Sequence, residues 1–221
     1  MTGAIRPFRR SDRDQLTALV NAHAQAVVPG VSVSVNAVLS HLEREPGEFV
    51  VDPGADLGLP TPGVYGVPEQ WPHVADLLGR VGFVRGDRTE LVYLADVDRL
   101  PSPAPGLEVV RTFGVAGTRF TARHDGVDVG RIEVDPNIAG TGRLAGHDGW
   151  ADIGNLHVDP AHRRRGIGTR LLAEVGDWLR LARIPRLLDY ATPDEPEHRA
   201  FLEHHGFLLL TRTHRDWQLP G

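Results

Sequence analysis

The sequence predicts a mixed α/β fold, in which a central and mostly antiparallel sheet is flanked by helices. Three alternating apolar segments between Leu107 and Val134 are typical of an antiparallel meander, because Asp125-Gly126 is a strong two-residue hairpin turn. A further strand-like segment over residues 150–158 leads through a short loop into a helix-like segment. A helix followed by Gly-Phe and then a strand occurs near the end of each half of the chain.

The elements of the first half follow from capping residues and apolar periodicity. Ser11 is a favourable N-cap residue, and the helix after it is expected to stop by Pro29-Gly30. The side chains expected on the inward face of this helix are those of Leu16, Leu19, Val20 and His23. A second short helix is expected around residues 35–42, a third over about 69–81, and a strand over 89–94.

The second half carries the stronger pattern. Strands are expected over residues 107–113, 119–124, 129–134, 150–158 and 186–191, and helices over about 168–183 and 197–205. The ending FLEHHGF, residues 201–207, is similar to LLGRVGF, residues 77–83, and a glycine at this place ends a helix. This similarity suggests a duplication, in which residues 51–68 are too few to have kept the loop and long helix of the second copy.

A proline-rich stretch separates the two halves. The segment DRLPSPAPGL begins at residue 98 and holds three prolines, which neither donate to a ladder nor continue a helix. We therefore expect a linker over residues 98–106. It would join a degenerate N-terminal half, residues 1–97, to a C-terminal domain, residues 107–221.

Composition excludes several classes of function. The 24 Lys and Arg against 29 Asp and Glu give a net charge of −5, which argues against non-specific binding to nucleic acid or to an anionic membrane. The chain has no cysteine, so cysteine nucleophiles and cysteine zinc sites are excluded. Its 11 histidines show no HExxH-type spacing, and no metal site is expected. No signal peptide or membrane-spanning run is apparent, so we expect a cytoplasmic protein, and its arginine-rich composition suggests a bacterial source.

The run HRRRGIG, residues 162–168, has the features of an anion-binding loop. Glycines at the start of a helix expose unbonded N–H groups at the positive end of the helix dipole. Guanidinium groups grip phosphate oxygens in pairs. A P-loop would need Lys and Ser or Thr after its second glycine, and a dinucleotide-binding loop would need a third glycine, which this run lacks. Without its context, the run could also be a solvated basic turn.

The longer segment IGNLHVDPAHRRRGIGTRLLAEVGDWL resembles the signature of the GNAT acyltransferase superfamily, whose motif is Gln/Arg-x-x-Gly-x-Gly/Ala. The resemblance covers about residues 107–217 and is weaker in the N-terminal half. It implies the GNAT fold, and a loop that binds the pyrophosphate of acetyl-CoA while the pantetheine arm lies between two splayed strands. The cofactor-binding residues that it implies are Leu156, His157, Val158, Arg163, Arg164, Arg165, Gly166, Ile167, Gly168 and Thr169.

Catalytic residues are less clearly indicated. Asp152 matches a position where several GNAT enzymes carry a carboxylate base, and Glu133 is a second carboxylate for this role. In the family, a tyrosine four residues before the Gly-Phe glycine often protonates the leaving thiolate, but Leu202 stands there. Tyr190, His204 and His205 are candidates to replace the missing tyrosine as the proton donor. Each of these side chains could instead have a structural role.

The resulting prediction is an N-acetyltransferase that moves an acetyl group from acetyl-CoA to an amine by direct attack. The acceptor amine could belong to a small molecule or to a peptide, and the oligomeric state could be a monomer or a homodimer. The alternative is a catalytically inactive GNAT-derived module that binds acyl-CoA or a partner protein, which the loss of the tyrosine at Leu202 favours.

Overall fold

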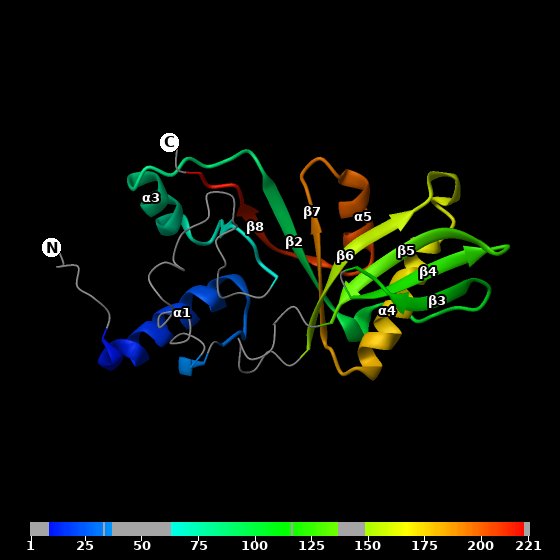
Figure 1. The fold of residues 1–221 in the computed structure, drawn as a ribbon, viewed down its shortest axis with the longest axis horizontal. Coiled ribbons are helices and arrows are strands. Elements are labelled where there is room, and N and C mark those ends of the chain that lie inside the picture. Colours follow the sequence, from blue (N-terminus) through cyan, green and yellow to red (C-terminus); the bar gives the residue numbers. More distant parts are fainter. Residues whose placement is uncertain (1–8, 33, 37–62, 116, 137–148, 219–221) are drawn as a thin grey trace.

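The computed structural model describes residues 9–32, 34–36, 63–115, 117–136 and 149–218. These residues form an eight-stranded sheet with the spatial order β1-β8-β2-β7-β6-β5-β4-β3. Neighbouring strands are antiparallel except β6 and β7, which are parallel. Helices cover both faces of the sheet (Figure 1). The predicted mixed fold with a mostly antiparallel sheet is therefore confirmed.

The second half supplies six of the strands and two long helices. Its elements are β3 (Glu108–Phe113), β4 (Thr118–His124), β5 (Val127–Asp135), β6 (Trp150–Val158), η4 (Pro160–His162), α4 (Ile167–Leu181), β7 (Arg186–Ala191), α5 (Pro196–His204) and β8 (Leu208–His214). The predicted bounds of β6 and β7 are confirmed to the residue. Asp125 and Gly126 both have positive φ, as expected for the two-residue turn between β4 and β5.

The first half supplies η1 (Arg10–Asp12), α1 (Arg13–Val27), β1 (Val67–Pro68), α3 (Pro72–Arg80), β2 (Thr89–Asp96) and η3 (Val97–Arg99). Ser11 was expected to cap α1 but lies inside η1, and the N-cap is Asp12. The predicted helix over residues 35–42 lies mostly outside the described residues, as do residues 51–62 of the segment 51–68 that was expected to be shortened.

The inward face of α1 was predicted only in part, because Leu16, Val20 and His23 are half-buried and Leu19 is not. Leu19 is 54% exposed, whereas Thr17, Ala24 and Val27 are buried. Thr17 can be buried because its hydroxyl donates to the carbonyl oxygen of Arg13 at 2.7 Å, which satisfies its polar group inside the helix. The small Ala24 lets the helix approach its neighbours closely, and this tertiary packing decides the face more than apolar periodicity does.

Strand β2 joins the two halves, because it lies between β7 and β8 of the second half and pairs with both. The similar endings of the halves have the same backbone geometry. Gly82 and Gly206 both have positive φ, and the N–H of the following phenylalanine donates to the carbonyl of the residue five positions earlier. These bonds join Phe83 to Leu78 and Phe207 to Leu202.

The proline-rich stretch contacts the second half rather than hanging free. Leu100 is buried, and its carbonyl oxygen accepts a hydrogen bond from Nη2 of Arg180 at 2.6 Å. Gly176 of α4 faces Leu100 so closely that an added Cβ would lie 3.1 Å from the Cβ of Leu100. Beyond η3 the stretch has no helix or strand, as its prolines predict.

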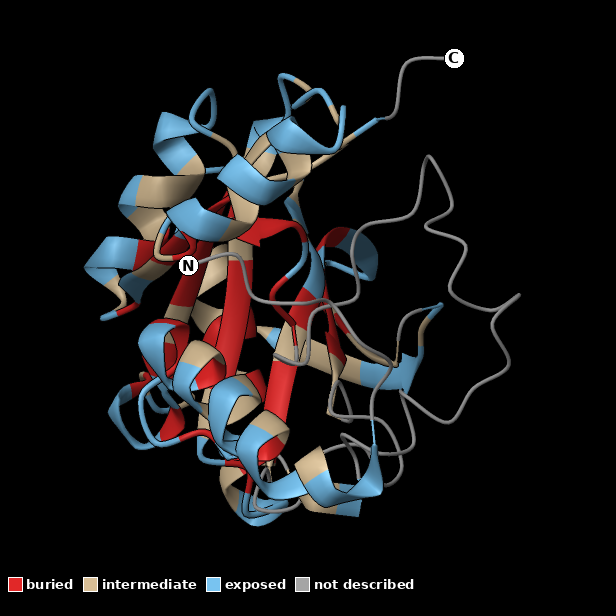
Figure 2. Ribbon diagram, turned by 90° about the vertical axis from the view of Figure 1, so that its left-hand side faces the viewer, coloured by how far each residue is buried: buried red, intermediate tan, exposed pale blue. Residues whose placement is uncertain are grey.

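Two apolar cores lie on opposite faces of the sheet, whose central strands are the most buried part of the molecule (Figure 2). The larger core joins α4 and Leu202 of α5 to one face. The smaller core packs α1 and α3 on the other face, against side chains such as Val92, Trp150 and Leu188. No described helix is long and apolar enough to cross a bilayer.

Helix α4 offers a matched test of the larger core. Leu179 is fully buried and Leu181 is 80% exposed. We expect Leu179→Ala to lower the free energy of unfolding by about 2–5 kcal/mol, because it removes apolar contacts and leaves a cavity. Leu181→Ala should change it by less than about 0.5 kcal/mol. Urea unfolding followed by circular dichroism measures both, and equal losses would contradict the orientation of α4.

Candidate functional site

The site is built where the two parallel strands separate. The β6–β7 ladder pairs Trp150 with Arg186 and ends at Asp152 and Leu188. Beyond these residues β6 pairs only with β5, and β7 pairs only with β2. The facing edges therefore hold main-chain N–H and C=O groups that no sheet ladder uses. Such groups need other partners when they are shielded from water, and a ligand can provide them.

An irregularity in β6 lies beside this separation. Glu133 pairs with Asn155 and Val134 pairs with Ile153, so Gly154 is an extra residue on β6. A bulge of this kind bends a strand and changes the direction of its neighbouring groups. It increases the divergence of β6 from β7 at the level where their ladder has just ended.

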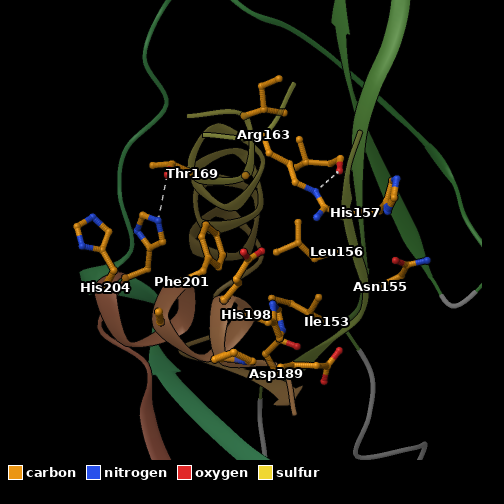
Figure 3. Close-up of a pocket in the computed structure, with 18 of the residues that line it drawn as sticks. Ile153, Asn155, Leu156, His157, Arg163, Thr169, Asp189, His198, Phe201 and His204 are labelled. Atoms are coloured by element: carbon orange, nitrogen blue, oxygen red, sulfur yellow. Dashed lines mark hydrogen bonds and ion pairs between the residues drawn. The ribbon is translucent and has the colours of Figure 1, made fainter. Parts of the chain in front are cut away.

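A cleft of about 1430 Å³ occupies the space between the strands. Its wall comes from residues 153–158 of β6, the loop that enters α4, the end of β7 and the first turns of α5. Figure 3 shows Ile153, Leu156 and Arg163 on one side of this space and Phe201 and His198 on the other. The cleft is large enough for an extended ligand, since ordinary ligand pockets measure about 300–1,000 Å³.

The predicted anion loop has the expected place and conformation. Gly166 is the N-cap of α4 with a φ of 80°, and Arg164 also has positive φ. A Cβ on Gly166 would meet no atom within 4 Å, so this glycine serves the left-handed backbone and leaves the helix N-terminus open. Gly168 is a glycine for a different reason, which is close packing: a Cβ there would lie 3.2 Å from the ring of Phe201.

The three arginines have different surroundings. Arg163 and Arg164 are exposed and line the cleft, whereas Arg165 is exposed outside its wall. Nε of Arg163 donates to the carbonyl oxygen of Val158 at 3.1 Å, which holds this side chain beside the end of β6 (Figure 3). The remaining guanidinium nitrogens of Arg163 can still donate to a ligand.

The other predicted cofactor-binding residues all line the cleft. Leu156 and Val158 also pack against the larger core, Ile167 belongs to that core, and His157 is exposed. Oγ1 of Thr169 lies 3.0 Å from Nε2 of His205, which ties the first turn of α4 to the end of α5. Burial and the neighbouring His204 lower the pKa of His205.

Asp152 and Tyr190 form a hydrogen-bonded pair beside the cleft. The Tyr190 hydroxyl donates to Oδ2 of Asp152 at 3.1 Å. Tyr190 is a residue of the cleft wall, whereas Asp152 lies just outside that wall. Burial raises the pKa of Asp152 to about 6, although the Tyr190 hydrogen bond opposes this, and the charges of Asp135 and Asp189 add to it. Burial and the Asp152 charge raise the pKa of Tyr190, which keeps its hydroxyl a donor.

Glu133 has a structural environment instead. Its carboxylate accepts hydrogen bonds from Nε of Arg119 at 2.6 Å and from the N–H of Val115 at 3.1 Å. The residue is 4% exposed and lies outside the cleft wall. The structure thus joins Asp152 to Tyr190, a residue of the cleft wall, whereas these partners of Glu133 do not line the cleft.

Three cleft residues were missed by the sequence analysis. Asp189 is a fully buried carboxylate in the apolar strand β7, and His198 of α5 lies 3.3 Å from it, Nε2 to Oδ2. Glu90 reaches the cleft wall from β2 of the first half and pairs with Arg215 at 2.9 Å. A charged residue inside RLLDYA was the one available signal, because isolated buried carboxylates are costly. Glu90 could not be placed without the strand order.

Leu202, where the expected acid is missing, is fully buried in the larger core. His204 and His205 line the outer part of the cleft, at the last turn of α5. His205 is already bonded to Thr169, next to the anion loop. These two histidines are therefore associated with the loop end of the cleft, and Tyr190 with its inner end.

Comparison with known proteins identifies the family to which this architecture is similar. A family model described as the acetyltransferase (GNAT) family matches residues 99–207. No curated protein sequence matches the chain. A tandem GNAT protein from the clavulanic acid biosynthesis pathway has a TM-score of 0.53 at 18% identity, and 68% of this chain and 59% of that one are covered.

Two further solved structures show the same similarity. A GCN5-related N-acetyltransferase from Kribbella flavida has a TM-score of 0.50 at 16% identity, with 68% of this chain and 65% of that one covered. A Drosophila protein has a TM-score of 0.50 at 15% identity, with 70% and 59% covered. The chain thus spans less than two thirds of these structures. At such identities the likeness shows the fold alone, which is the fold that the sequence motif implied.

The Tyr190–Asp152 hydrogen bond can be tested directly. Because this bond favours the ionised carboxylate, Tyr190→Phe should raise the pKa of Asp152 above about 6. Carbon-detected NMR titration of the aspartate carboxyl groups measures the shift. Tyr93→Phe is the control, since the Tyr93 hydroxyl bonds to Glu203 instead. An unchanged Asp152 titration in Tyr190→Phe would contradict the pairing.

Proposed function

Because residues 99–207 of this chain are a domain of the acetyltransferase (GNAT) family, we propose that the protein is an N-acetyltransferase that uses acetyl-CoA. The acetyl group passes to an amine by direct attack on the thioester. The observation that carries this proposal is the juxtaposition of an open glycine-containing loop, a cleft between separated strands, and an acid–base pair of which one member, Tyr190, lines that cleft.

The coenzyme has a complementary surface in the cleft. Its pyrophosphate would accept hydrogen bonds from the N–H groups that follow Gly166 and from the side chains of Arg163 and Arg164. Each charge-assisted bond contributes roughly 1.5–3 kcal/mol, against about 0.3–1 kcal/mol for the helix dipole at an exposed end. The amide groups of pantetheine would pair with the open edge of β6 near Leu156 and Val158.

Asp152 is the proposed general base. The attacking amine must lose a proton, and with a lysine-like pKa of about 10.4 a neutral amine at pH 7 costs roughly 4.6 kcal/mol. A base works best when its pKa is near the operating pH, and a carboxylate at about 6 meets that condition while remaining largely ionised at pH 7. Tyr190 holds Asp152 in place and faces the cleft.

One observation favours the alternative of a module that binds acyl-CoA without catalysis. The position of the missing tyrosine, Leu202, is fully buried and apolar, so it offers no proton to a leaving thiolate. A thiol with a pKa near 8.5 can leave as thiolate with little help, so this loss does not by itself prevent turnover.

Release of free thiol separates the two functions. The wild-type protein should release CoA thiol from acetyl-CoA in the presence of at least one member of a panel of amines, and acetyl-CoA should raise its melting temperature. A melting shift without thiol release from any amine would instead support the binding module. Absence of both responses would contradict the proposal of a coenzyme site.

The rise in melting temperature with increasing acetyl-CoA also tests the loop, because its concentration dependence reports the Kd. Replacing Arg163 and Arg164 together by Gln removes two cleft guanidinium groups and should raise the Kd for acetyl-CoA roughly tenfold or more. Arg111→Gln, an exposed arginine on the distant edge strand β3, should leave the Kd unchanged. Equal binding by both variants would show that the arginines do not contact the coenzyme.

Asp152→Asn tests the base. We expect kcat to fall roughly 10²–10⁴-fold, because the amide cannot accept the amine proton. Wild-type kcat should fall as pH decreases through about 6, where Asp152 becomes protonated, and the residual activity of the variant should lack this step. The control is Asp125→Asn, at a 91%-exposed side chain in a turn that Asn adopts well. Retention of full activity by Asp152→Asn would refute the role.

A further inference from the structure

Two titratable pairs lie on opposite faces of the sheet because they are attached to consecutive residues of one strand. Side chains alternate across a strand, so Asp189 and Tyr190 point to opposite faces of the sheet. Tyr190 joins Asp152 on the face that α1 and α3 cover. Asp189 joins His198 of α5 on the other face. Asp189, Tyr190 and His198 all line the cleft.

The Asp189–His198 pair is held firmly and yet reaches the cleft. The Asp189 side chain is 5% exposed, and the N–H of Tyr190 donates to its Oδ1 at 2.7 Å. Oδ2 faces Nε2 of His198 at 3.3 Å, and the His198 side chain is 24% exposed. Its ring stacks on Phe201 with an interplanar angle of 12°. Figure 3 shows His198 extending from α5 toward Asp189, opposite Ile153 of β6.

His198 also stands in a defined relation to Leu202. The two residues are four positions apart on α5 and therefore share a face of the helix, one turn apart. Leu202 turns that face into the apolar core, whereas His198 lies at the wall of the cleft. The imidazole is thus a titratable group of this helix face that lines the cleft and lies beside Asp189 of β7.

On the proposed function, the position of the anion loop would bring the pantetheine arm and its sulfur to the α5 side of the cleft. The loop that enters α4 and the helix α5 lie together, because Gly168 contacts Phe201 and Thr169 bonds to His205. On the proposed function, the arm starts at this loop and runs inward, so it brings its sulfur past α5 before its acetyl group reaches Asp152. Asp152 and His198 themselves lie on opposite faces of the sheet.

We propose that His198, positioned by Asp189, is the catalytic acid that protonates the departing CoA thiolate. This inference rests on the proposed acetyl transfer. The amine lone pair forms the C–N bond, and collapse of the tetrahedral intermediate breaks the C–S bond and leaves the electron pair on sulfur. The imidazolium N–H bond of His198 then breaks and its proton joins that pair, while Asp152 takes the amine proton. Solvent restores both groups, and the net products are the amide and free CoA thiol.

The electrostatic surroundings favour the protonated form of His198. Contact with Asp189 raises the pKa of His198 above its usual value, burial opposes this, and the charge of Glu195 adds to it. The titratable groups of the cleft wall, by element, are His157 of β6, His162, Arg163 and Arg164 of the anion loop, Asp189 and Tyr190 of β7, Glu90 of β2, and Asp194, Glu195, Glu197, His204 and His205 in or next to α5. Most of the groups near the start of α5 are acidic and favour the imidazolium.

The thiol pKa of bound CoA provides a test that needs no acceptor. An imidazolium beside a thiol lowers its pKa below the usual value of about 8.5. Titration of the thiolate ultraviolet absorbance of bound CoA should therefore give a lower pKa with the wild-type protein than with His198→Gln. His73→Gln, at an exposed histidine of α3 outside the cleft, should match the wild type. A CoA-induced rise in melting temperature verifies that each variant is folded and has bound CoA. If His198→Gln does not fold, His198→Asn replaces it.

Turnover supplies the complementary readout. In His198→Gln, kcat should fall roughly 10–100-fold with the KM for acetyl-CoA within about threefold, and the loss of activity at pH above the His198 pKa should disappear. Asp189→Asn removes the charge that positions His198, so the loss of activity at high pH should begin at a lower pH than in the wild type. Bound CoA with the same thiol pKa in wild type and His198→Gln would overturn the role of His198, even if the wild type transfers acetyl groups. A lowered thiol pKa without any amine turnover would support His198 beside the sulfur while refuting the proposed function.

Discussion

The main constraint on this structure is the early end of the parallel ladder between β6 and β7. Three pairs of residues hold the strands together, and after Asp152 and Leu188 the extra residue Gly154 helps to turn β6 away. Each strand is kept in the sheet by its other neighbour, so the separation does not unravel the fold. What results is a cleft whose walls carry main-chain hydrogen-bonding groups, a surface suited to an extended ligand that has its own amides.

This constraint also organises the chemistry. Because side chains alternate along β7, one dipeptide sends Tyr190 to Asp152 on one face and Asp189 to His198 on the other. Burial raises the pKa of Asp152 to about 6, and the contact with Asp189 raises the pKa of His198. In the proposed reaction Asp152 accepts a proton and His198 donates one, from opposite faces of the sheet.

The first half of the chain contributes strand β2 and two covering helices to this arrangement. β2 completes the sheet beside β7, and in that register Tyr93 lies opposite Asp189. It also brings Glu90 to the cleft, paired with Arg215 and with a raised pKa caused by burial. Helices α1 and α3 cover the face on which Asp152 and Tyr190 meet. The N-terminal half therefore borders the region where we expect the acceptor, whatever its evolutionary origin.

Local sequence determined the elements whose cause is local. Alternation, the Asp125-Gly126 turn and the glycine at the start of α4 depend on neighbouring residues, so the positions of β6, β7, the hairpin and the loop before α4 were predicted closely. Tertiary structure alone decided the inward face of α1, the insertion of β2 between β7 and β8, and the difference between Asp152 and Glu133. It also brought His198 to Asp189. These features depend on contacts between residues far apart in the chain, and the periodicity of a short segment carries no information about them.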